Sequence, residues 1–215
     1  YMKDYSAYLF DADGTLFDTV EMIFQCYKYT CKKFGNLSIT RELVFKNIGI
    51  PLKNQFEYFF DTLSDEKAEE VIKAYMDYQL KIFKEYLCLF PGVSEILHIL
   101  KKKGKKLAIV TSRRIESLII YLEHTNILDL FDVLVTPEST EKHKPLPEPA
   151  SEALKQLNCK NRESLFIGDA TFDIECGKNA GMDTAFVAWS KNTQSSLKFE
   201  PTYILNNMCD LVNFY

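Results

Sequence analysis

The stretch that decides the fold is Ala7-Tyr8-Leu9-Phe10-Asp11-Ala12-Asp13-Gly14-Thr15-Leu16. Its apolar start predicts a short buried strand, and two carboxylates follow where that strand ends. In an open α/β sheet the carboxyl ends of the strands form the ligand-binding edge. Gly14 permits a turn whose amides can cradle phosphate oxygens. Asp-x-Asp-Gly alone also fits a plain turn or a calcium-loop fragment, but the rest of the calcium motif is missing and the place after a strand favours a functional site.

Similar apolar runs recur along the chain and alternate with helical patterns. Expected strands are residues 7–10, 107–110, 133–135, 165–167, 185–188 and 203–205. Expected helices between them are residues 93–103, 116–124, 148–157 and 173–180. This alternation predicts an α/β fold, a Rossmann-like, doubly wound parallel sheet with helices on both faces.

One interval, from Phe17 to Leu89, breaks the alternation because it contains no strand pattern. Residues 19–34 are typical of a helix, and a later stripe of apolar side chains has helical spacing: Val71, Tyr75, Tyr78 and Ile82. We therefore predict a core formed by residues 1–16 and 90–215, with residues 17–89 inserted as a helical cap domain.

Three further signals follow expected strands or precede a helix. Thr111-Ser112-Arg113 follows residues 107–110, although Thr and Ser also commonly cap helices. Lys144 precedes a proline-rich helix entry and would, alone, pass for a surface lysine. Asp169 and Asp173 follow residues 165–167; a helix N-cap explains Asp173 but not Asp169. Each signal is weak alone, but their combination is specific.

Together these motifs resemble the haloacid dehalogenase superfamily of phosphatases, and the resemblance covers nearly the whole chain. It implies that Asp11 is the nucleophile and Asp13 the general acid/base. It implies that Thr111 binds the transferring phosphoryl group and that Lys144 neutralises charge. The inserted cap is also a feature of the superfamily.

The resemblance further implies a magnesium site. Its ligands would be Asp11, the backbone carbonyl of Asp13, and Asp169, with Asp173 holding the metal through water. Such an oxygen-only set suits Mg²⁺. Electrostatics supports a cation here, because two like charges about 4 Å apart cost roughly 4 kcal/mol at an effective dielectric constant of 20.

Finer similarity favours the phosphoglycolate phosphatases and the related bacterial pyrophosphatases. It lies in Gly49-Ile50-Pro51-Leu52, in residues 144–149 and in residues 180–189. The expected substrate is a small phosphorylated metabolite, either a phosphoglycolate-like phosphomonoester or pyrophosphate. Many relatives carry Asn-Lys where this chain has Ser112-Arg113, which leaves the role of Arg113 open. The expected substrate contacts are Gly14, Thr15, Ser112, Arg113, Gly49 and Lys53.

Two alternatives stay open. A sugar phosphomutase of the same superfamily retains both aspartates and would be recognised by isomerised sugar phosphate. A phospho-accepting receiver module, from a different class, also uses acidic residues, a hydroxyl and a lysine around magnesium. The paired aspartates and the long insert disfavour the receiver, because receivers are compact and uncapped.

The composition of the chain limits the kinds of partner that we expect. The chain has 26 Lys and Arg against 30 Asp and Glu, and the net charge of −4 disfavours nucleic acid. Six scattered cysteines include no Cys-x-x-Cys pair, which disfavours zinc. No signal peptide or transmembrane run is apparent, so we expect a cytoplasmic enzyme without a membrane partner. We also expect a monomer or weak dimer.

Overall fold

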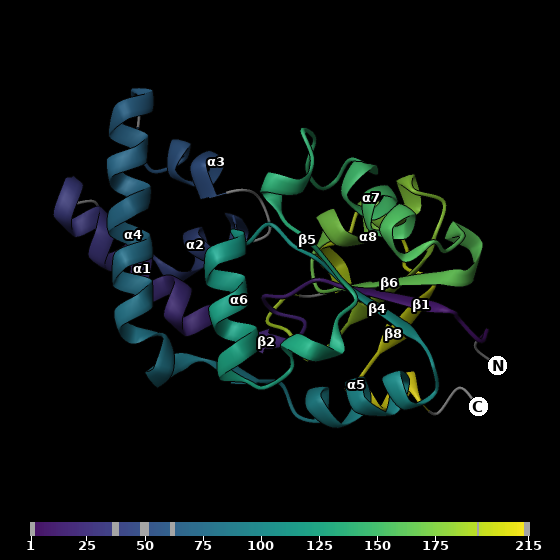
Figure 1. Cartoon of the computed structure of the whole chain (residues 1–215). Helices are drawn as coiled ribbons and strands as arrows, with labels where there is room; N and C mark the ends of the chain where they lie inside the picture. The colour runs from purple at the N-terminus through teal and green to yellow at the C-terminus, as the bar shows by residue number, and fades with distance from the viewer. Residues whose placement is uncertain (1–2, 36–38, 48–51, 61–62, 193, 213–215) are drawn as a thin grey trace.

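A six-stranded parallel sheet forms the centre of the molecule (Figure 1). The computed structural model describes residues 3–35, 39–47, 52–60, 63–192 and 194–212. The strand order is β5-β4-β1-β6-β7-β8, which places β1 between β4 and β6. The strands are β1 (Ala7–Phe10), β4 (Lys106–Val110), β5 (Val133–Val135), β6 (Ser164–Gly168), β7 (Asp183–Val187) and β8 (Tyr203–Leu205).

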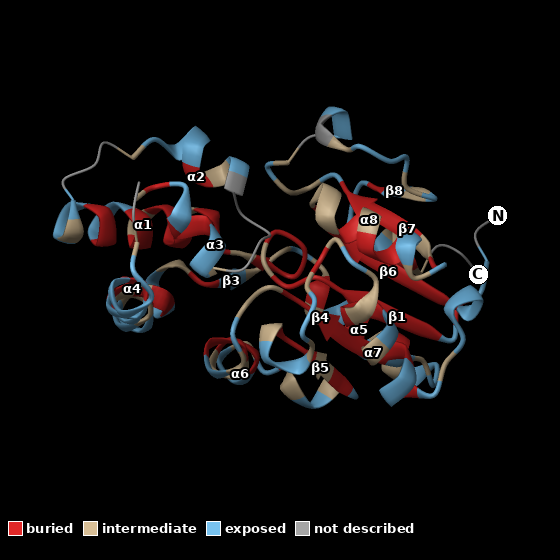
Figure 2. Ribbon diagram, turned by 90° about the horizontal axis from the view of Figure 1, so that it is seen from above, coloured by how far each residue is buried: buried red, intermediate tan, exposed pale blue. Residues whose placement is uncertain are grey.

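Helices cover both faces of this sheet, because alternate side chains of each strand point to opposite faces. On β1, Tyr8 and Phe10 belong to the core shared with α5 (Val93–Lys102) and α6 (Ile115–His124). Ala7 and Leu9 belong to the core shared with α7 (Glu148–Leu157) and α8 (Thr171–Asn179). Figure 2 shows the buried strands between helices whose outer surfaces are exposed. The predicted doubly wound α/β fold is confirmed.

Four helices lie between β1 and α5 along the chain: α1 (Val20–Phe34), α2 (Arg41–Asn47), α3 (Leu52–Glu57) and α4 (Asp65–Tyr86). We call them the helical insert; they lie to one side of the sheet (Figure 1). Aromatic rings hold the insert together. The Tyr27 ring on α1 lies 5.0 Å from the Phe56 ring on α3 and 5.2 Å from the Tyr75 ring on α4, centroid to centroid.

A short antiparallel ladder joins the two ends of the insert, so the prediction of a strandless interval from Phe17 to Leu89 was wrong at its ends. Strand β2 (Phe17–Asp18) pairs with β3 (Cys88–Leu89). Each strand has two residues. That length is too short to show the alternation of side chains by which a strand is recognised in sequence.

The predicted elements of the core agree closely with the structure. β1, β5, β8 and α7 match residue for residue, and the other predicted strands and helices differ by one or two residues at an end. Short 3₁₀ helices complete the chain: η1 (Leu128–Leu130), η2 (Pro137–Ser139), η3 (Asn161–Glu163), η4 (Gln194–Ser196) and η5 (Met208–Leu211). In the part of the chain described here, no helix is long and apolar enough to cross a membrane.

Candidate active site

The turn after β1 carries Asp11 and Asp13. The amide of Asp11 donates to the Ile167 carbonyl at 2.9 Å, which continues the pairing with β6 one residue beyond the strand. Gly14 adopts a left-handed φ of +84°. A Cβ at position 14 would lie 2.2 Å from Oδ2 of Asp169, so only glycine allows the turn to approach that carboxylate.

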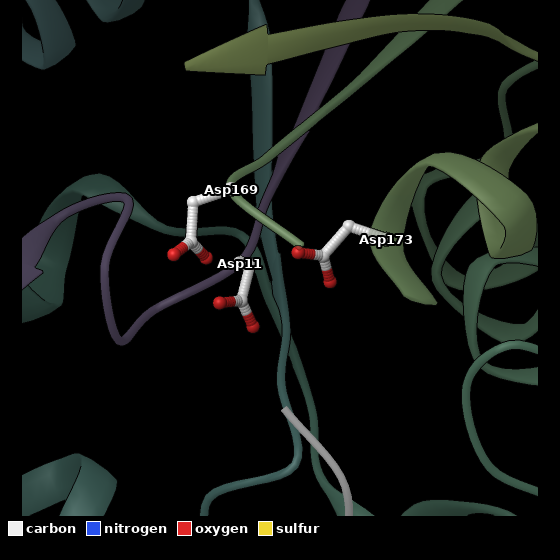
Figure 3. Close-up of side chains that lie close together, drawn as sticks. All are labelled: Asp11, Asp169 and Asp173. Carbon is white, nitrogen blue, oxygen red and sulfur yellow. The ribbon is translucent and has the colours of Figure 1, made fainter. Parts of the chain in front are cut away.

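Three carboxylates converge at this edge of the sheet (Figure 3). Asp11, Asp169 and Asp173 are buried, and one oxygen from each lies within 4.8 Å of the others. The topology explains the meeting: Asp11 directly follows β1, Asp169 directly follows the neighbouring β6, and Asp173 lies in the first turn of α8. The close approach of α8 also requires Gly168, where a Cβ would lie 2.3 Å from the Cβ of Asp173.

Lys144 inserts into the same cluster from the loop before α7. Its ammonium donates to Oδ1 of Asp11 at 2.7 Å and to Oδ1 of Asp173 at 2.6 Å. Its side chain is only 2% exposed, so the lysine is a buried partner of the carboxylates rather than a surface residue. The Ala170 amide donates to Oδ2 of Asp173 at 3.0 Å, which fixes that carboxylate further.

The cluster carries more negative than positive charge, three carboxylates against one lysine. Burial, with repulsion from Asp173, raises the pKa of Asp169 to about 7. Burial also raises the pKa of Asp11 well above its usual range, although Lys144 opposes this shift. Burial tends to lower the pKa of Lys144, but Asp11 and Asp173 outweigh it and keep the lysine charged. A divalent cation would offset the excess charge, and the all-oxygen donor set fits magnesium.

Two residues that sequence reasoning missed orient Asp169. Ser190 Oγ and Asn192 Nδ2 both donate to its Oδ2, at 2.6 and 2.8 Å. These bonds leave Oδ1 for a cation. A signal was present, because Ser190-Lys191-Asn192 follows β7 at the same edge of the sheet.

Asp13 lies outside this cluster and pairs with the guanidinium of Arg113. Nε of Arg113 donates to Oδ2 of Asp13 at 2.8 Å, and Nη2 donates to Oδ1 at 2.6 Å. Thr19, which the sequence analysis also missed, donates its hydroxyl to the same Oδ1 at 2.5 Å. Arg113 was expected to contact substrate; in the structure its bidentate partner is the Asp13 carboxylate.

A cavity of about 70 Å³ separates the sheet edge from the helical insert. Asp11 and Asp13 both line it, together with Thr111, Ser112, Arg113 and Asp169. The insert contributes mainly apolar and amide side chains: Ile23, Leu52, Gln55, Tyr75, Met76 and Gln79. The predicted nucleophile and acid/base therefore face the same cavity.

Two other predicted substrate contacts, Thr15 and Lys53, do not line this cavity. Thr15 is fully buried and not part of the cavity lining, and its Oγ1 has no hydrogen-bond partner within the described residues. Lys53 is the second residue of α3, is exposed and forms an ion pair with Asp65 at 2.8 Å. It does not line the cavity, whose wall is formed by Leu52 and Gln55 instead. Gly49 lies outside the described residues.

Comparison with known proteins identifies the family to which the chain belongs. The sequence model described as haloacid dehalogenase-like hydrolase matches residues 8–187, a span that contains the whole cluster described above. The chain belongs to this family. The resemblance expected from the motifs is confirmed, and the parallel sheet with its acidic edge is the family's fold.

Individual members of the haloacid dehalogenase-like hydrolases are also similar over their full length. Pyrophosphatase PpaX of Bacillus velezensis is 37% identical over 212 residues, covering 98% of this chain and 96% of that protein. A crystal structure of a predicted phosphoglycolate phosphatase from Haemophilus somnus has a TM-score of 0.89 at 22% identity, covering 99% of both chains. The β-phosphoglucomutase of Clostridium difficile has a TM-score of 0.84 at 21% identity, covering 96% of this chain and 93% of that one. At 22% and 21% identity, these two structural similarities show a shared fold and nothing further.

Proposed function

We propose that this chain is a magnesium-dependent phosphatase that hydrolyses a small phosphorylated metabolite through an aspartyl-phosphate intermediate. The observation that carries the proposal is the pair Asp11 and Asp13, which line one cavity while each is bound by a different buried cation. One carboxylate is therefore held for attack and the other for proton transfer.

The residues fit a magnesium ion. Asp11 and Asp169 would supply carboxylate oxygens, the backbone carbonyl of Asp13 is the third protein ligand proposed, and Asp173 would hold the ion through water. When bound, the ion would neutralise the cluster and polarise the phosphoryl group of the substrate.

In the proposed mechanism, Asp11 attacks phosphorus and forms an acyl phosphate. The ammonium of Lys144, already 2.7 Å from Asp11, stabilises the charge on the phosphoryl oxygens together with the Thr111 hydroxyl. Asp13 protonates the leaving oxygen, and afterwards removes a proton from the water that hydrolyses the acyl phosphate. One carboxyl group serves both steps because its protonation state alternates between them.

We further propose that residues 17–89 form a cap domain over this core. The cavity wall formed by Leu52, Gln55, Tyr75 and other insert residues supports this role, because closure there excludes water from the reacting groups. The small volume of the cavity, about 70 Å³, supports a small substrate. The likeness to PpaX supports pyrophosphate, or a phosphoglycolate-like monoester, within that class. Six free cysteines support a cytoplasmic location.

Phosphate release across a metabolite panel tests the proposal. The panel contains phosphoglycolate, pyrophosphate, sugar phosphates and nucleotides, each with Mg²⁺ and with EDTA. We expect release from a subset of small substrates that disappears with EDTA and returns when Mg²⁺ is re-added. Full activity in EDTA would contradict the metal assignment, and isomerised sugar phosphate without released phosphate would identify a mutase instead.

A further inference from the structure

The Arg113 guanidinium bridges the sheet edge and the helical insert. Two of its nitrogens bind Asp13, as described above. Its third, Nη1, donates to Oε1 of Gln79 on α4 at 2.9 Å and to Oγ of Ser117 on α6 at 3.3 Å. The guanidinium also lies over the Tyr121 ring, 4.3 Å from its centroid. Each nitrogen of the guanidinium therefore has a hydrogen-bond partner, and one of these partners belongs to the insert.

Gln79 is a polar residue in an otherwise apolar stripe. The side chains at every fourth position of α4, Val71, Tyr75, Gln79 and Phe83, are all buried. Gln79 is only 1% exposed. A buried amide costs free energy unless it forms hydrogen bonds, whereas leucine or methionine would pack there without that cost. The bond from Arg113 satisfies the carbonyl oxygen of this amide, which an apolar side chain at position 79 could not provide.

We infer that Gln79 is a positioning residue for Asp13 and acts through Arg113. A bidentate arginine pair sets both the position and the plane of a carboxylate. Arg113 can hold Asp13 in one orientation only while its own third nitrogen is held. The shorter of its two bonds, 2.9 Å to Gln79 against 3.3 Å to Ser117, is with the insert, so proton transfer at the sheet edge depends on where α4 lies. The inference rests on the proposed function, because it assigns a determinant of its proton-transfer step.

The dependence of rate on the leaving group isolates this role. Phenyl phosphate and p-nitrophenyl phosphate are similar in shape, but nitrophenolate leaves with little help from an acid, whereas phenolate needs its proton. The ratio of kcat/KM for p-nitrophenyl phosphate to that for phenyl phosphate therefore reports how well Asp13 donates. A residue that only stabilises the fold lowers both values together and leaves the ratio unchanged.

The experiment measures this ratio with Mg²⁺ in the wild type and four variants. Gln79→Met keeps the length and packing but removes the acceptor, and should raise the ratio about threefold, the effect of one hydrogen bond. Arg113→Lys keeps the charge but loses the bidentate geometry, and should raise it further, by about tenfold. Ser117→Ala is the matched control, because it removes the other acceptor of Nη1 from outside the insert; the ratio should stay within about twofold. Gln79→Leu also removes the acceptor, with an apolar side chain of similar size, and should raise the ratio by the same factor.

Each outcome decides the inference. An unchanged ratio in folded Gln79→Met, or a parallel loss with both substrates, overturns it. An equal rise in Ser117→Ala also overturns it, because the coupling would then not come from the insert. If Gln79→Met does not fold, the ratio in Gln79→Leu decides in its place, and an unchanged ratio in Arg113→Lys overturns the inference in either case. Failure of the wild type to release phosphate from either ester is a separate result, which overturns the proposed function and the inference with it.

Discussion

Two buried groups of charges share the active site and differ in their balance. In the first, Lys144 faces the three carboxylates of Asp11, Asp169 and Asp173. In the second, Arg113 faces Asp13 alone. The first group has excess negative charge and attracts a cation, whereas the second is neutral as a pair and has no electrostatic need of one. The comparison separates a group suited to holding metal and phosphate from a group suited to holding the direction of one carboxylate.

Removing the nucleophile should give the largest effect. Asp11→Asn leaves no carboxylate to attack phosphorus, so we expect a loss of about 10⁴-fold or more in kcat, and no phosphoenzyme. Rapid-quench kinetics and intact-mass measurement check both. Asp18→Asn, at the end of β2, is the control and should form the phosphoenzyme normally. A phosphoenzyme in Asp11→Asn would reverse the roles assigned to the two charge groups.

Removing the acid/base should give a smaller and different effect. Asp13→Asn leaves the Lys144 group intact, so attack by Asp11 on p-nitrophenyl phosphate should continue. Water attack then lacks its base, and turnover should fall by about 10²–10⁴-fold. A burst of nitrophenol followed by slow turnover is expected, with phosphate trapped on Asp11. A phosphorylated residue other than Asp11 in this variant would contradict the assignment.

Magnesium should stabilise the protein through the first group and not through the second. At an ion concentration 100 times the dissociation constant, binding adds about 2.7 kcal/mol, or a rise of several degrees in Tm for a chain of this size. The rise should persist in Arg113→Lys, which changes the balanced pair, and should be lost in Asp169→Ala. Thermal unfolding with and without Mg²⁺ measures it, independently of activity. Loss of the rise in Arg113→Lys would show that the two groups are not separable.

The smallest effect is expected at Lys53, which belongs to neither group. It is exposed, and its ion pair with Asp65 keeps it away from the cavity wall. Lys53→Ala should change the ratio of kcat/KM between phosphoglycolate and a sugar phosphate by less than about twofold. A larger change would mean that the lysine leaves Asp65 to reach substrate, as the sequence had suggested.

Much of the first charge group could be predicted from the sequence. Asp11 and Asp169 each follow a short apolar strand, and the carboxyl ends of neighbouring parallel strands meet at one edge. The strand pattern alone therefore brings residues more than 150 positions apart to the same site. The order of the strands, with β1 beside β6, completes the arrangement.

The second group could not be predicted in the same way. The contact of Arg113 with Asp13 depends on side-chain direction, and its contact with Gln79 depends on how α4 packs against the core. Periodicity indicates which face of α4 is buried, but not what that face meets. Sequence reasoning left the role of Arg113 open and did not indicate its partner. Lys53 shows the converse. The sequence made it a plausible substrate contact, but in the structure it pairs with Asp65.

The pairing of β2 with β3 holds the two ends of the helical insert side by side. The Phe90 amide donates to the Leu16 carbonyl at 3.0 Å, so the chain leaves the core and returns to it at neighbouring points. Joining these points needs only a short turn and would not stretch the sheet. The insert therefore joins the core at one compact junction. If the insert acts as the proposed cap, exchanging it between relatives at this junction should change substrate selectivity, provided that the incoming helix carries its own partner for Arg113.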